Sequence, residues 1–466
     1  MIGIKRGVGL VAGSVVTGLF VAGVTLAVTT PWPTAAREPL SVTAVPAPEE
    51  SILACTGPVL ALGRDAGDAG ALTDAAVPRV TAATGDGDAD PDQSRLAAQN
   101  VVDGEGPAVF RAAPQGRTRT DLAAAGSAAL ADDDLRGFTA SACSPPLMES
   151  WLVGGSGLTG ASDLIVLANP GDVAARVELT VYGALGAAVP ATGRDILVPA
   201  GTQRVIPMAS VALGEGSPVV RVTAAEAPVR ASLQTSITRT LIPTGVDQVG
   251  AAAAPTETSV IPGFSVVREP GDAGASNTTT LLRILAPAAD AEAVVEIRRV
   301  GGEIVDTRTV PLTAAVPLEL DLDGLATGTY TVRVTAPTPV TAALWEATGY
   351  GEGDDFAWHT AADVIGVPSL FAVARGPSPL LVLTNDDAED VAVQIVPDAG
   401  GGEAVEVTVP AAGSTRYPVR SGAVYQLVPG GDSLRASIGF SDDDQLAGYT
   451  VTPADAAAAA VEVFVQ

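Results

Sequence analysis

Histidine and cysteine are scarce in this chain of 466 residues, which has one histidine and two cysteines. A single histidine excludes histidine-rich metal sites and most Ser-His-Asp or Cys-His hydrolases, unless His359 is itself the general base. No G-x-S-x-G motif accompanies His359, so we expect it to be a surface or strand-end residue. No C-x-x-C motif points to thiol–disulfide catalysis, and a zinc site would need two more soft ligands. We therefore expect no catalytic residues, no cofactor and no metal site.

Basic residues are also few, since 26 Lys and Arg stand against 53 Asp and Glu, giving a net charge of −27. Phosphate backbones repel so acidic a chain, and nucleic-acid binding is disfavoured. A solvated acidic surface is the expected reading, and weak binding of divalent cations is the alternative. The string D-G-D-A-D-P-D at 86–92 resembles the start of a calcium loop, but Pro91 and Ala97 replace the glycine and glutamate of an EF-hand. We expect a disordered acidic loop there, and the same at 442–444.

Aromatic residues make up only 4% of the chain, whereas there are 51 glycines and 35 prolines. This composition suits many short strands joined by turns better than it suits long helices. The chain is 47% hydrophobic and long enough for three or four domains, so burial of apolar surface is not limiting. We expect an all-β protein.

Charge is absent from the apolar run at residues 7–30, which follows Lys5 and Arg6. About 24 residues at about 1.5 Å each can span a hydrocarbon core of about 30 Å. We predict that residues 1–30 form a transmembrane signal anchor with its N-terminus in the cytoplasm and the rest of the chain exported, because basic residues stay on the cytoplasmic side. The alternative is a secreted protein cleaved near Thr34-Ala35-Ala36. Residues 31–50 are rich in proline and should form an extended linker.

A strand–turn–strand pattern occurs three times. Residues 163–183 read D-L-I-V-L-A-N-P-G-D-V-A-A-R-V-E-L-T-V-Y-G, with alternating apolar residues on both sides of an Asn-Pro-Gly turn. Similar strand pairs begin at Leu282 and at Leu380. We interpret each pair as the opening hairpin of a repeat, and we predict closing hairpins at 218–233, 329–345 and 424–438.

The opening strands begin near residues 164, 282 and 380, so the repeat is far longer than that of a solenoid. It has the size of one seven-stranded β-sandwich, about 100 residues. We predict tandem immunoglobulin-like β-sandwich domains behind the transmembrane helix, with a β-propeller-like arrangement of the repeats as the alternative. The predicted boundaries are 1–30 for the anchor, 31–50 for the linker, 51–147 for a degenerate β domain, and 148–255, 256–366 and 367–466 for three sandwich repeats.

The region 51–147 ends with L-R-G-F-T-A-S-A-C, which resembles V-R-A-S-L-Q-T-S at 229–236 and L-R-A-S-I-G-F-S at 434–441. We interpret this region as a degenerate first repeat. Cys55 and Cys143 fall on its first and last strands, and an even cysteine count in an exported chain indicates a disulfide. Two free thiols or a metal-binding pair are the alternatives. A disulfide closing a loop of about 88 residues would stabilise the fold by about 4–5 kcal/mol.

The densest aromatic cluster surrounds the acidic string G-Y-G-E-G-D-D-F-A-W at 349–358. Aromatic faces stack on sugar rings and carboxylates accept hydrogen bonds from sugar hydroxyls, so this loop is a candidate glycan-binding site. The alternative is that the aromatic rings fill the core of the second repeat while the acidic residues lie in a turn. The candidate residues are Trp345, Tyr350, Asp354, Asp355, Phe356 and Trp358.

Three strings together resemble a known family: C-T-G-P at 55–58, E-S-W-L-V-G-G-S at 149–156 and D-F-A-W at 355–358. They are similar to a family of actinobacterial exported, cell-envelope proteins of unknown function. The resemblance implies a location outside the cytoplasm. It implies neither a reaction nor catalytic residues.

These observations favour a non-catalytic, membrane-anchored extracytoplasmic protein that serves as a scaffold or accessory factor in the cell envelope. The expected partners are the membrane and envelope proteins or glycans. A glycan-binding module is one alternative. A carboxylate-dependent glycoside hydrolase is the other, because such an enzyme needs two carboxyl groups about 5–10 Å apart in a cleft and no histidine.

Overall fold

The computed structural model divides the chain into two compact units, Met1–Pro46 with Ala458–Gln466, and Ala47–Ala457. Most of the described residues lie in β-strands, and nearly all of the helical ones belong to one N-terminal helix. The predicted all-β class is therefore confirmed. The structure describes residues 3–29, 41–44, 47–65, 67–68, 70–85, 90–102, 104–116, 118–268, 279–322, 324–397, 402–442, 444–454 and 461–464.

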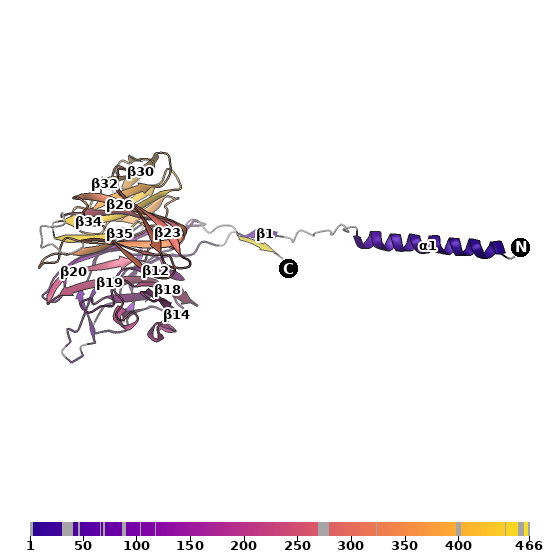
Figure 1. Ribbon diagram of the computed structural model, residues 1–466. Coiled ribbons are helices and arrows are strands. Elements are labelled where there is room, and N and C mark those ends of the chain that lie inside the picture. Colours follow the sequence, from indigo (N-terminus) through magenta and orange to yellow (C-terminus); the bar gives the residue numbers. More distant parts are fainter. Residues whose placement is uncertain are drawn as a thin grey trace. The chain divides into compact units, whose positions relative to one another are not determined.

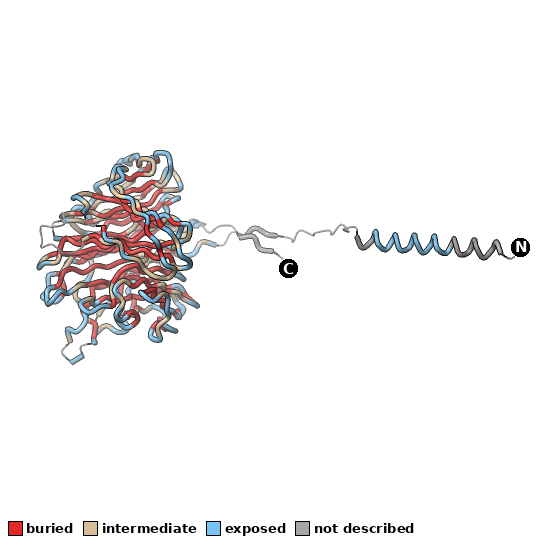
Figure 2. The backbone as a smooth tube through the Cα atoms, viewed as in Figure 1, coloured by how far each residue is buried: buried red, intermediate tan, exposed pale blue. Residues whose placement is uncertain are grey.

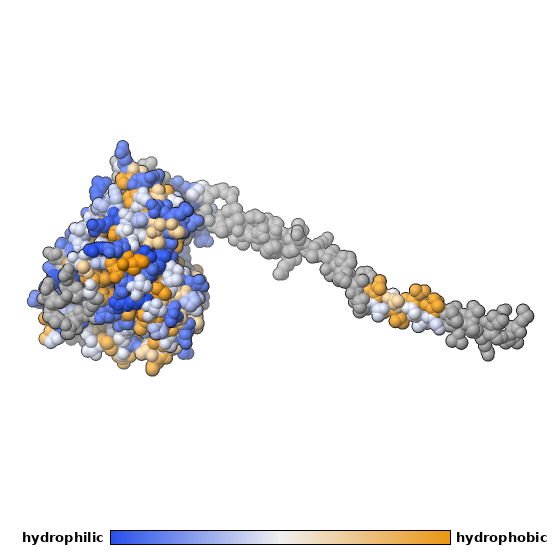
Figure 3. Space-filling model, turned by 45° about the horizontal axis from the view of Figure 1, so that its top comes forward, coloured by the Kyte–Doolittle hydropathy of each residue, from blue (hydrophilic) through white to orange (hydrophobic). Residues whose placement is uncertain are grey.

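The first unit contains helix α1 (Gly3–Thr29) and an antiparallel pair of strands, β1 (Ser41–Ala44) and β36 (Val461–Phe464). The described side chains of α1, at 13–26, are exposed, and Figure 3 shows many of them as hydrophobic. Within the residues that the structure describes, no helix combines the length and the apolarity needed to cross a membrane. The transmembrane segment stays a prediction. Residues 31–40 and 45–46 of the predicted linker lie outside the described residues.

The second unit consists of four groups of strands, which we call modules I to IV, at residues 51–142, 149–250, 256–360 and 369–450. In Figure 1 strands of module IV, in yellow and orange, lie at the top of this unit and strands of module II, in magenta, lie at the bottom. The described hydrophobic clusters and the disulfide all belong to this unit. The described buried side chains of residues 47–457 thus pack against one another.

Module I is built from short strands: β2 (Ser51–Ala54), β3 (Val59–Leu62), β4 (Leu72–Ala76), β5 (Arg79–Thr84), β6 (Asp92–Arg95), β7 (Ala97–Ala98), β8 (Val101–Val102), β9 (Ala108–Ala112), β10 (Leu122–Ala131) and β11 (Arg136–Ala142). They form three small sheets, with orders β11–β10–β5, β2–β9–β6 and β3–β4–β8. The remaining strand, β7, pairs in parallel with residues 202–203 of module II. One strand of module I is therefore part of a sheet of module II.

Module II is a sandwich of two sheets with one hydrophobic cluster between them. Its strands are β12 (Glu149–Val153), β13 (Leu164–Asn169), β14 (Ala175–Gly183), β15 (Gly186–Ala188), β16 (Ile196–Val198), β17 (Thr202–Pro207), β18 (Val219–Ala225), β19 (Arg230–Arg239) and β20 (Ile242–Gly250). One sheet has the order β12–β18–β14–β15, with β16 also on β14, and the other has the order β20–β19–β13–β17–β7. Val177, Leu179 and Val181 of β14 all enter the cluster because alternate side chains share one face.

Module III contains β21 (Thr256–Val266), β22 (Thr280–Leu285), β23 (Ala291–Arg299), β24 (Ile304–Leu312), β25 (Leu318–Asp321), β26 (Gly328–Ala347) and β27 (Phe356–Thr360). The first half of β26 pairs with β21 and β23, and its second half pairs with β22 and β27. The predicted hairpin at 329–345 is therefore wrong, because these residues form one continuous strand. Pro337 and Pro339 lie where β26 passes between the layers. Neither pairs with a residue of β21, β22 or β23 there, so their missing N–H groups cost no ladder hydrogen bond.

Module IV repeats the two-sheet plan. Its sheets have the orders β28–β33–β30–β31 and β32–β29–β34–β35. The strands are β28 (Ser369–Ala372), β29 (Leu380–Asn385), β30 (Val391–Pro397), β31 (Val405–Val409), β32 (Ser414–Pro418), β33 (Val424–Val428), β34 (Leu434–Asp442) and β35 (Gln445–Thr450).

The recurring strand–turn–strand pattern is a corner between two sheets. β13 pairs with β17 and β19, whereas β14 pairs with β18 in the facing sheet. The predicted opening hairpins are therefore wrong, in module IV as well, where β29 and β30 also lie in different sheets. Asn169 explains the corner, because its Nδ2 donates to the carbonyls of Val173 (2.8 Å) and Val198 (3.0 Å) and its Oδ1 accepts from the Gly171 N–H (3.0 Å). Asn385 makes the corresponding bonds in module IV.

Hairpins occur at other places, and four of them are β10–β11, β19–β20, β26–β27 and β34–β35. The predicted closing hairpins at 218–233 and 424–438 are wrong, because each range joins strands of different sheets. The proposed match between the three closing strings is wrong as well. The string at 135–143 forms the second strand of its hairpin, β11, whereas those at 229–236 and 434–441 form first strands, β19 and β34.

The second strands of these four hairpins meet at the centre of the unit. β11 packs against β20 and β35, and β27 packs against the same two strands, so the four form a closed ring of contacts, called here the central ring. Figure 2 shows buried backbone running continuously through the unit. One cluster joins Phe138 of module I to module IV, and another joins Phe356 of module III to module II. The domain boundaries, the immunoglobulin-like class and the propeller-like alternative stay predictions.

Candidate functional site

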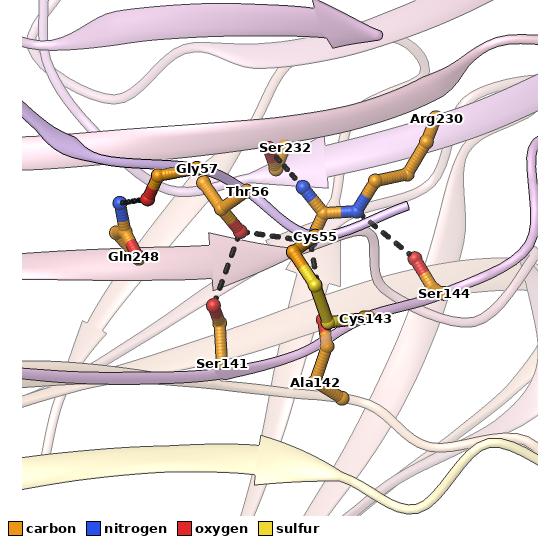
Figure 4. Close-up of a disulfide and its surroundings, with 10 residues drawn as sticks. All are labelled: Cys55, Thr56, Gly57, Ser141, Ala142, Cys143, Ser144, Arg230, Ser232 and Gln248. Atoms are coloured by element: carbon orange, nitrogen blue, oxygen red, sulfur yellow. Dashed lines mark hydrogen bonds between the residues drawn. A yellow bond between two sulfur atoms is a disulfide. The ribbon is translucent and has the colours of Figure 1, made fainter. Parts of the chain in front are cut away.

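A disulfide between Cys55 and Cys143 closes module I (Figure 4). Each cysteine is 4% exposed. Next to them, Ala54 and Ser144 exchange two backbone hydrogen bonds of 3.0 and 3.1 Å. The disulfide therefore reinforces a small antiparallel bridge between the start and the end of module I, at the positions that the sequence indicates.

A buried arginine of module II reaches this disulfide. Arg230 lies in β19, and its guanidinium donates to the hydroxyls of Thr56 (2.8 Å) and Ser144 (3.2 Å), one beside each cysteine. Further hydrogen bonds go to the Ser232 hydroxyl (2.8 Å) and the Ala142 carbonyl (3.2 Å). None of these four acceptors is a carboxylate, and burial lowers the pKa of Arg230 to about 9. Arg230 thus ties module II to both cysteine-bearing segments.

Two buried glutamines extend this interface. The Gln234 amide binds both backbone groups of Leu60, donating to its carbonyl at 2.7 Å and accepting from its N–H at 2.8 Å. Gln248 of β20 donates to the Gly57 carbonyl at 3.0 Å. A side-chain amide carries a donor and an acceptor, so it can replace a missing strand neighbour. The segment 56–60 of module I is therefore held by side chains of module II.

Two pockets flank the disulfide. One of about 350 Å³ lies between modules I and IV and is lined by residues that include Cys143 and Asp121. The other, of about 430 Å³, is lined by residues that include Cys55 and Asp90. The Asp121 carboxylate already accepts the Leu370 N–H at 2.7 Å. Each of these two pockets holds one carboxylate, whereas a glycoside hydrolase needs a pair.

Asp355 joins three modules at the central ring. The residue is fully buried and directly precedes β27. Its Oδ2 accepts hydrogen bonds from the backbone N–H groups of Phe138 in β11 (2.9 Å) and Leu446 in β35 (3.3 Å). Burial raises the pKa of Asp355 well above its ordinary value, and the nearby Asp247 carboxyl adds to this rise. The carboxyl therefore serves as a joint between modules I, III and IV.

Glycines on the neighbouring strands leave room for these side chains. Gly137 of β11 and Gly245 of β20 have φ values of 141° and 120°. A Cβ at Gly137 would lie 2.6 Å from Oδ1 of Asp355, and one at Gly245 would lie 2.8 Å from the same atom. A Cβ at Gly448 of β35 would lie 2.7 Å from Nδ1 of His359. Three strands of the central ring thus carry glycine where a module III side chain enters.

Two more buried carboxyls bind backbone N–H groups. Asp247 of β20 accepts from Trp358 of module III at 2.8 Å. Asp163 accepts from Ser156 (2.6 Å) and Ser236 (2.9 Å) within module II. Burial raises the pKa of each carboxyl to about 7. Neither carboxyl lines either of the two pockets.

Arg283 connects module III to the loops of module II. It lies in β22, is 2% exposed, and donates to the carbonyls of Gly155 (2.9 Å) and Pro218 (2.8 Å). It also pairs with Glu319 at 2.7 Å and lies 4.8 Å from the centre of the Trp358 ring. Burial lowers the pKa of Arg283, and Glu319 opposes this effect. The bases of two loops are thereby fixed to the neighbouring module.

The structure places the candidate glycan-binding aromatics mainly in the core. Trp345, Phe356 and Trp358 are 7%, 0% and 5% exposed and belong to the cluster shared by modules II and III. Tyr350 is half-buried, with Trp345 stacked on its ring at 5.8 Å and the Arg239 guanidinium 3.4 Å from its centre. A sugar ring stacks on an exposed aromatic face, which these contacts do not favour. Glycan binding stays a prediction.

The two acidic candidates of the same loop are also bound within the protein. Asp354 is 8% exposed and accepts from the Arg268 guanidinium (2.9 Å) and the Gly351 N–H (2.6 Å). Asp355 is the joint described above, and its own N–H donates to the Thr348 hydroxyl at 2.9 Å. These bonds hold the loop 348–355 closed.

His359 is buried, so the expected surface position is wrong. It lies in β27, whose residues are all buried because the strand pairs with β26 and packs against β20 and β35. Its Nε2 lies 3.3 Å from Oε2 of Glu346, which also accepts the Ser265 N–H at 3.2 Å. Burial raises the pKa of Glu346. The pair lies outside both pockets.

Metal ligands do not gather in the part of the chain that the structure describes, where no three His, Cys, Asp or Glu side chains could share an ion. The acidic string at 86–92 lies partly outside the described residues, which omit 86–89. Residue 443 is also omitted, and the neighbouring Asp444 pairs with Arg268 at 3.0 Å.

Sequence reasoning missed the side chains that join the modules, above all Arg230 and Asp247. A signal for the arginine was present, since R-A-S recurs at Arg230 and Arg435 near the starts of strands β19 and β34. Arg230 reaches the preceding module, and Arg435 donates to the carbonyl of Ala362, two residues after the end of module III, at 3.1 Å. Asp247 had no such repeated pattern.

The comparisons with known proteins assign no function to these residues. No curated protein is similar to the chain. A family model described as "Family of unknown function (DUF5719)" matches residues 97–420, from β7 of module I to β32 of module IV. The match includes Cys143 and the central joint Asp355 but not Cys55. Because it spans well over half of the chain, this protein belongs to that family of unknown function.

Proposed function

We propose that this protein is a non-catalytic scaffold or accessory factor of the cell envelope, with its N-terminal segment in a membrane and residues 47–457 outside the cytoplasm. The observation that carries this proposal is a set of buried hydrogen bonds that connects all four modules. Arg230 links modules I and II, Asp247 links II and III, and Asp355 links III to both IV and I. A body built in this way holds its surfaces at fixed spacing, which is what a scaffold requires.

Export is supported by the buried disulfide and the apolar N-terminal run. Disulfides persist in oxidising compartments and are rare in the cytoplasm. Lys5 and Arg6 before the uncharged run at 7–30 favour a cytoplasmic N-terminus and an exported remainder. Immunoglobulin-like modules are common in such extracellular arrays, and we propose that class for modules II to IV.

The buried carboxyls favour this proposal over a hydrolase, because they accept hydrogen bonds from the backbone. Asp163, Asp247 and Asp355 have raised pKa values, as catalytic acids often do, yet each binds backbone N–H groups away from the two pockets. Burial of the Trp345, Phe356 and Trp358 rings likewise favours a structural role over glycan stacking.

Fractionation of cells that express the full chain with a C-terminal tag tests the location. We expect the tag in the membrane fraction and open to protease added from outside. Cys55 and Cys143 should resist alkylation until a reductant and denaturant are added. A tag recovered from the soluble cytoplasm, with both thiols alkylated directly, would contradict the proposal.

Chemical crosslinking in intact cells tests the scaffold role. Wild type should capture envelope proteins, and Asp355→Ala should capture fewer because its modules lose their fixed arrangement. Glu352→Ala is the matched control, since this side chain is 77% exposed in the same loop. Failure of wild type to capture any envelope protein counts against a scaffold.

A further inference from the structure

Four loops at one end of module II carry strongly exposed leucines. Leu158, Leu185, Leu213 and Leu241 are 50%, 99%, 83% and 90% exposed, and Ile242 beside the last of them is 41% exposed. A single exposed leucine is ordinary on a protein surface. Four of them on neighbouring loops form an exposed apolar surface, which is typical of an interaction site.

The strand register shows that these loops share one end of the module. Val153 at the end of β12 and Tyr182 near the end of β14 both pair with Val219, the first residue of β18. Backbone hydrogen bonds then join the loops directly, from Gly157 N–H to the Glu215 carbonyl (2.8 Å) and from Thr238 N–H to the Gly160 carbonyl (2.7 Å). The four tips therefore belong to one surface.

The four loop tips carry no charged residue, although the protein as a whole is highly charged. Residues 156–160, 184–186, 211–214 and 240–242 contain no Asp, Glu, Lys or Arg, although the chain carries −27 overall. The nearest charged side chains are engaged, because Glu215 accepts the Ala184 N–H at 2.9 Å and Arg239 lies over Tyr350. The tips can therefore move from water into an apolar phase without desolvating a charged side chain. Such desolvation would cost several kcal/mol.

Two of the four loops, those that carry Leu158 and Leu213, are also held firmly at their bases. Arg283 binds the carbonyls of Gly155 and Pro218, and the buried Asp163 carboxyl binds the N–H of Ser156. A loop that is already ordered loses little conformational entropy when its tip is buried. Leu158 and Leu213 therefore project from loops that are already ordered.

We propose that these four loop tips insert into the interfacial region of a lipid bilayer, as a contact separate from the N-terminal segment and independent of the function proposed above. Single leucines on separate tips suit a fluid phase, whereas a protein partner would need a matched pocket for each. Since the tips lack basic residues and the chain is acidic, insertion depends on apolar burial and favours zwitterionic lipid over anionic lipid.

Co-sedimentation of residues 47–457 with phosphatidylcholine vesicles tests this insertion without interference from α1. The triple variant Leu185→Ser, Leu213→Ser, Leu241→Ser should partition about tenfold more weakly or worse, because each leucine contributes transfer free energy. The matched control is Leu147→Ser, Met148→Ser, Val173→Ser, which removes three exposed apolar side chains from the opposite end of module II. It should bind as wild type does, and added salt should not weaken binding.

Three outcomes would overturn the proposal. Wild type could fail to bind the vesicles, or the leucine variant could bind as tightly as wild type. Wild type could also form a dimer that the leucine variant abolishes, without vesicle binding, which would assign the surface to self-association. Near-ultraviolet circular dichroism of each variant shows that the fold is retained.

Discussion

The Oδ2 atom of Asp355 accepts a hydrogen bond from the backbone N–H of Phe138, a residue 217 positions earlier in the chain, at 2.9 Å. The same oxygen accepts from Leu446, 91 positions later. One buried carboxyl oxygen thus belongs to modules I, III and IV together. Because an unpaired N–H group is costly inside a protein, these modules are stable only while the joint is intact.

Replacement of Asp355 by alanine should destabilise the whole unit. Two backbone N–H groups would lose their buried acceptor, and the free energy of unfolding should fall by about 3 kcal/mol or more. Urea unfolding of residues 47–457, followed by circular dichroism, measures this change. Glu352→Ala, three residues earlier but 77% exposed, should stay within about 0.5 kcal/mol of wild type. An Asp355→Ala protein with a wild-type midpoint would exclude the joint.

Stability should fall as the pH rises from about 4 to about 7. Burial raises the pKa of Asp247 from 3.8 to about 7, so in this window the folded state binds more protons than the unfolded chain. The contribution is fully present below the unfolded pKa, is lost as the pH rises through the folded pKa, and is constant above it. Asp247→Asn cannot titrate, so its unfolding free energy should change less steeply with pH, although its overall stability is lower.

The control for this pH dependence is Asp195→Asn, whose side chain is 72% exposed. Its unfolding free energy, measured across the same window, shows what the loss of an exposed carboxyl does by itself. Identical slopes for wild type and Asp247→Asn would show that this carboxyl does not take up a proton on folding.

Removal of the disulfide should cost about 2–5 kcal/mol of unfolding free energy, because the unfolded chain regains a loop of 88 residues. The double variant Cys55→Ala, Cys143→Ala measures this cost in urea. Since both cysteines are 4% exposed, a reductant alone should leave the native bond intact until denaturant is added. Rapid reduction in the native state, or a double variant as stable as wild type, would contradict its structural role.

Arg230→Lys should destabilise the interface between modules I and II by about 2 kcal/mol or more. A lysine ammonium has three donors at one point and cannot reproduce the planar fork that binds Thr56, Ser144 and Ser232 together. Urea unfolding again provides the measurement. Arg176→Lys, at a side chain that is 50% exposed, is the matched control and should be nearly neutral. Equal stability of both variants would remove Arg230 from the account of this interface.

The sequence predicted the all-β class, the alternating burial of β14 and the disulfide between the two cysteines. These features depend on local pattern and on position along the chain. It did not reveal which strands pair. Alternation shows that a strand has a buried face but not which strand lies beside it, so the pattern around Asn169 predicts a hairpin turn where the structure has a corner between two sheets. That distinction depends on Val198, a distant residue whose carbonyl the asparagine binds.

The residues that join the modules could not be identified from the sequence for the same reason. Nothing near Asp355 in the sequence marks it as buried, since its acidic, glycine-rich loop is typical of an exposed turn. Its burial depends on Gly137 and Gly245, more than a hundred residues away, which leave room for its side chain. The string around these residues predicted a ligand-binding loop at Trp358 and a surface or strand-end position for His359. Both residues are instead buried in β27, which packs against β20 and β35.

Hydrogen exchange of residues 47–457 at increasing urea concentrations, resolved by peptide, tests most directly whether the four modules form one interlocked body. The bonds at Arg230, Asp247 and Asp355 predict that peptides from all four modules lose protection at a single urea midpoint. Independent sandwich domains would behave differently, with one module losing protection at its own midpoint while its neighbours stay protected. That second result would contradict the interlocked arrangement.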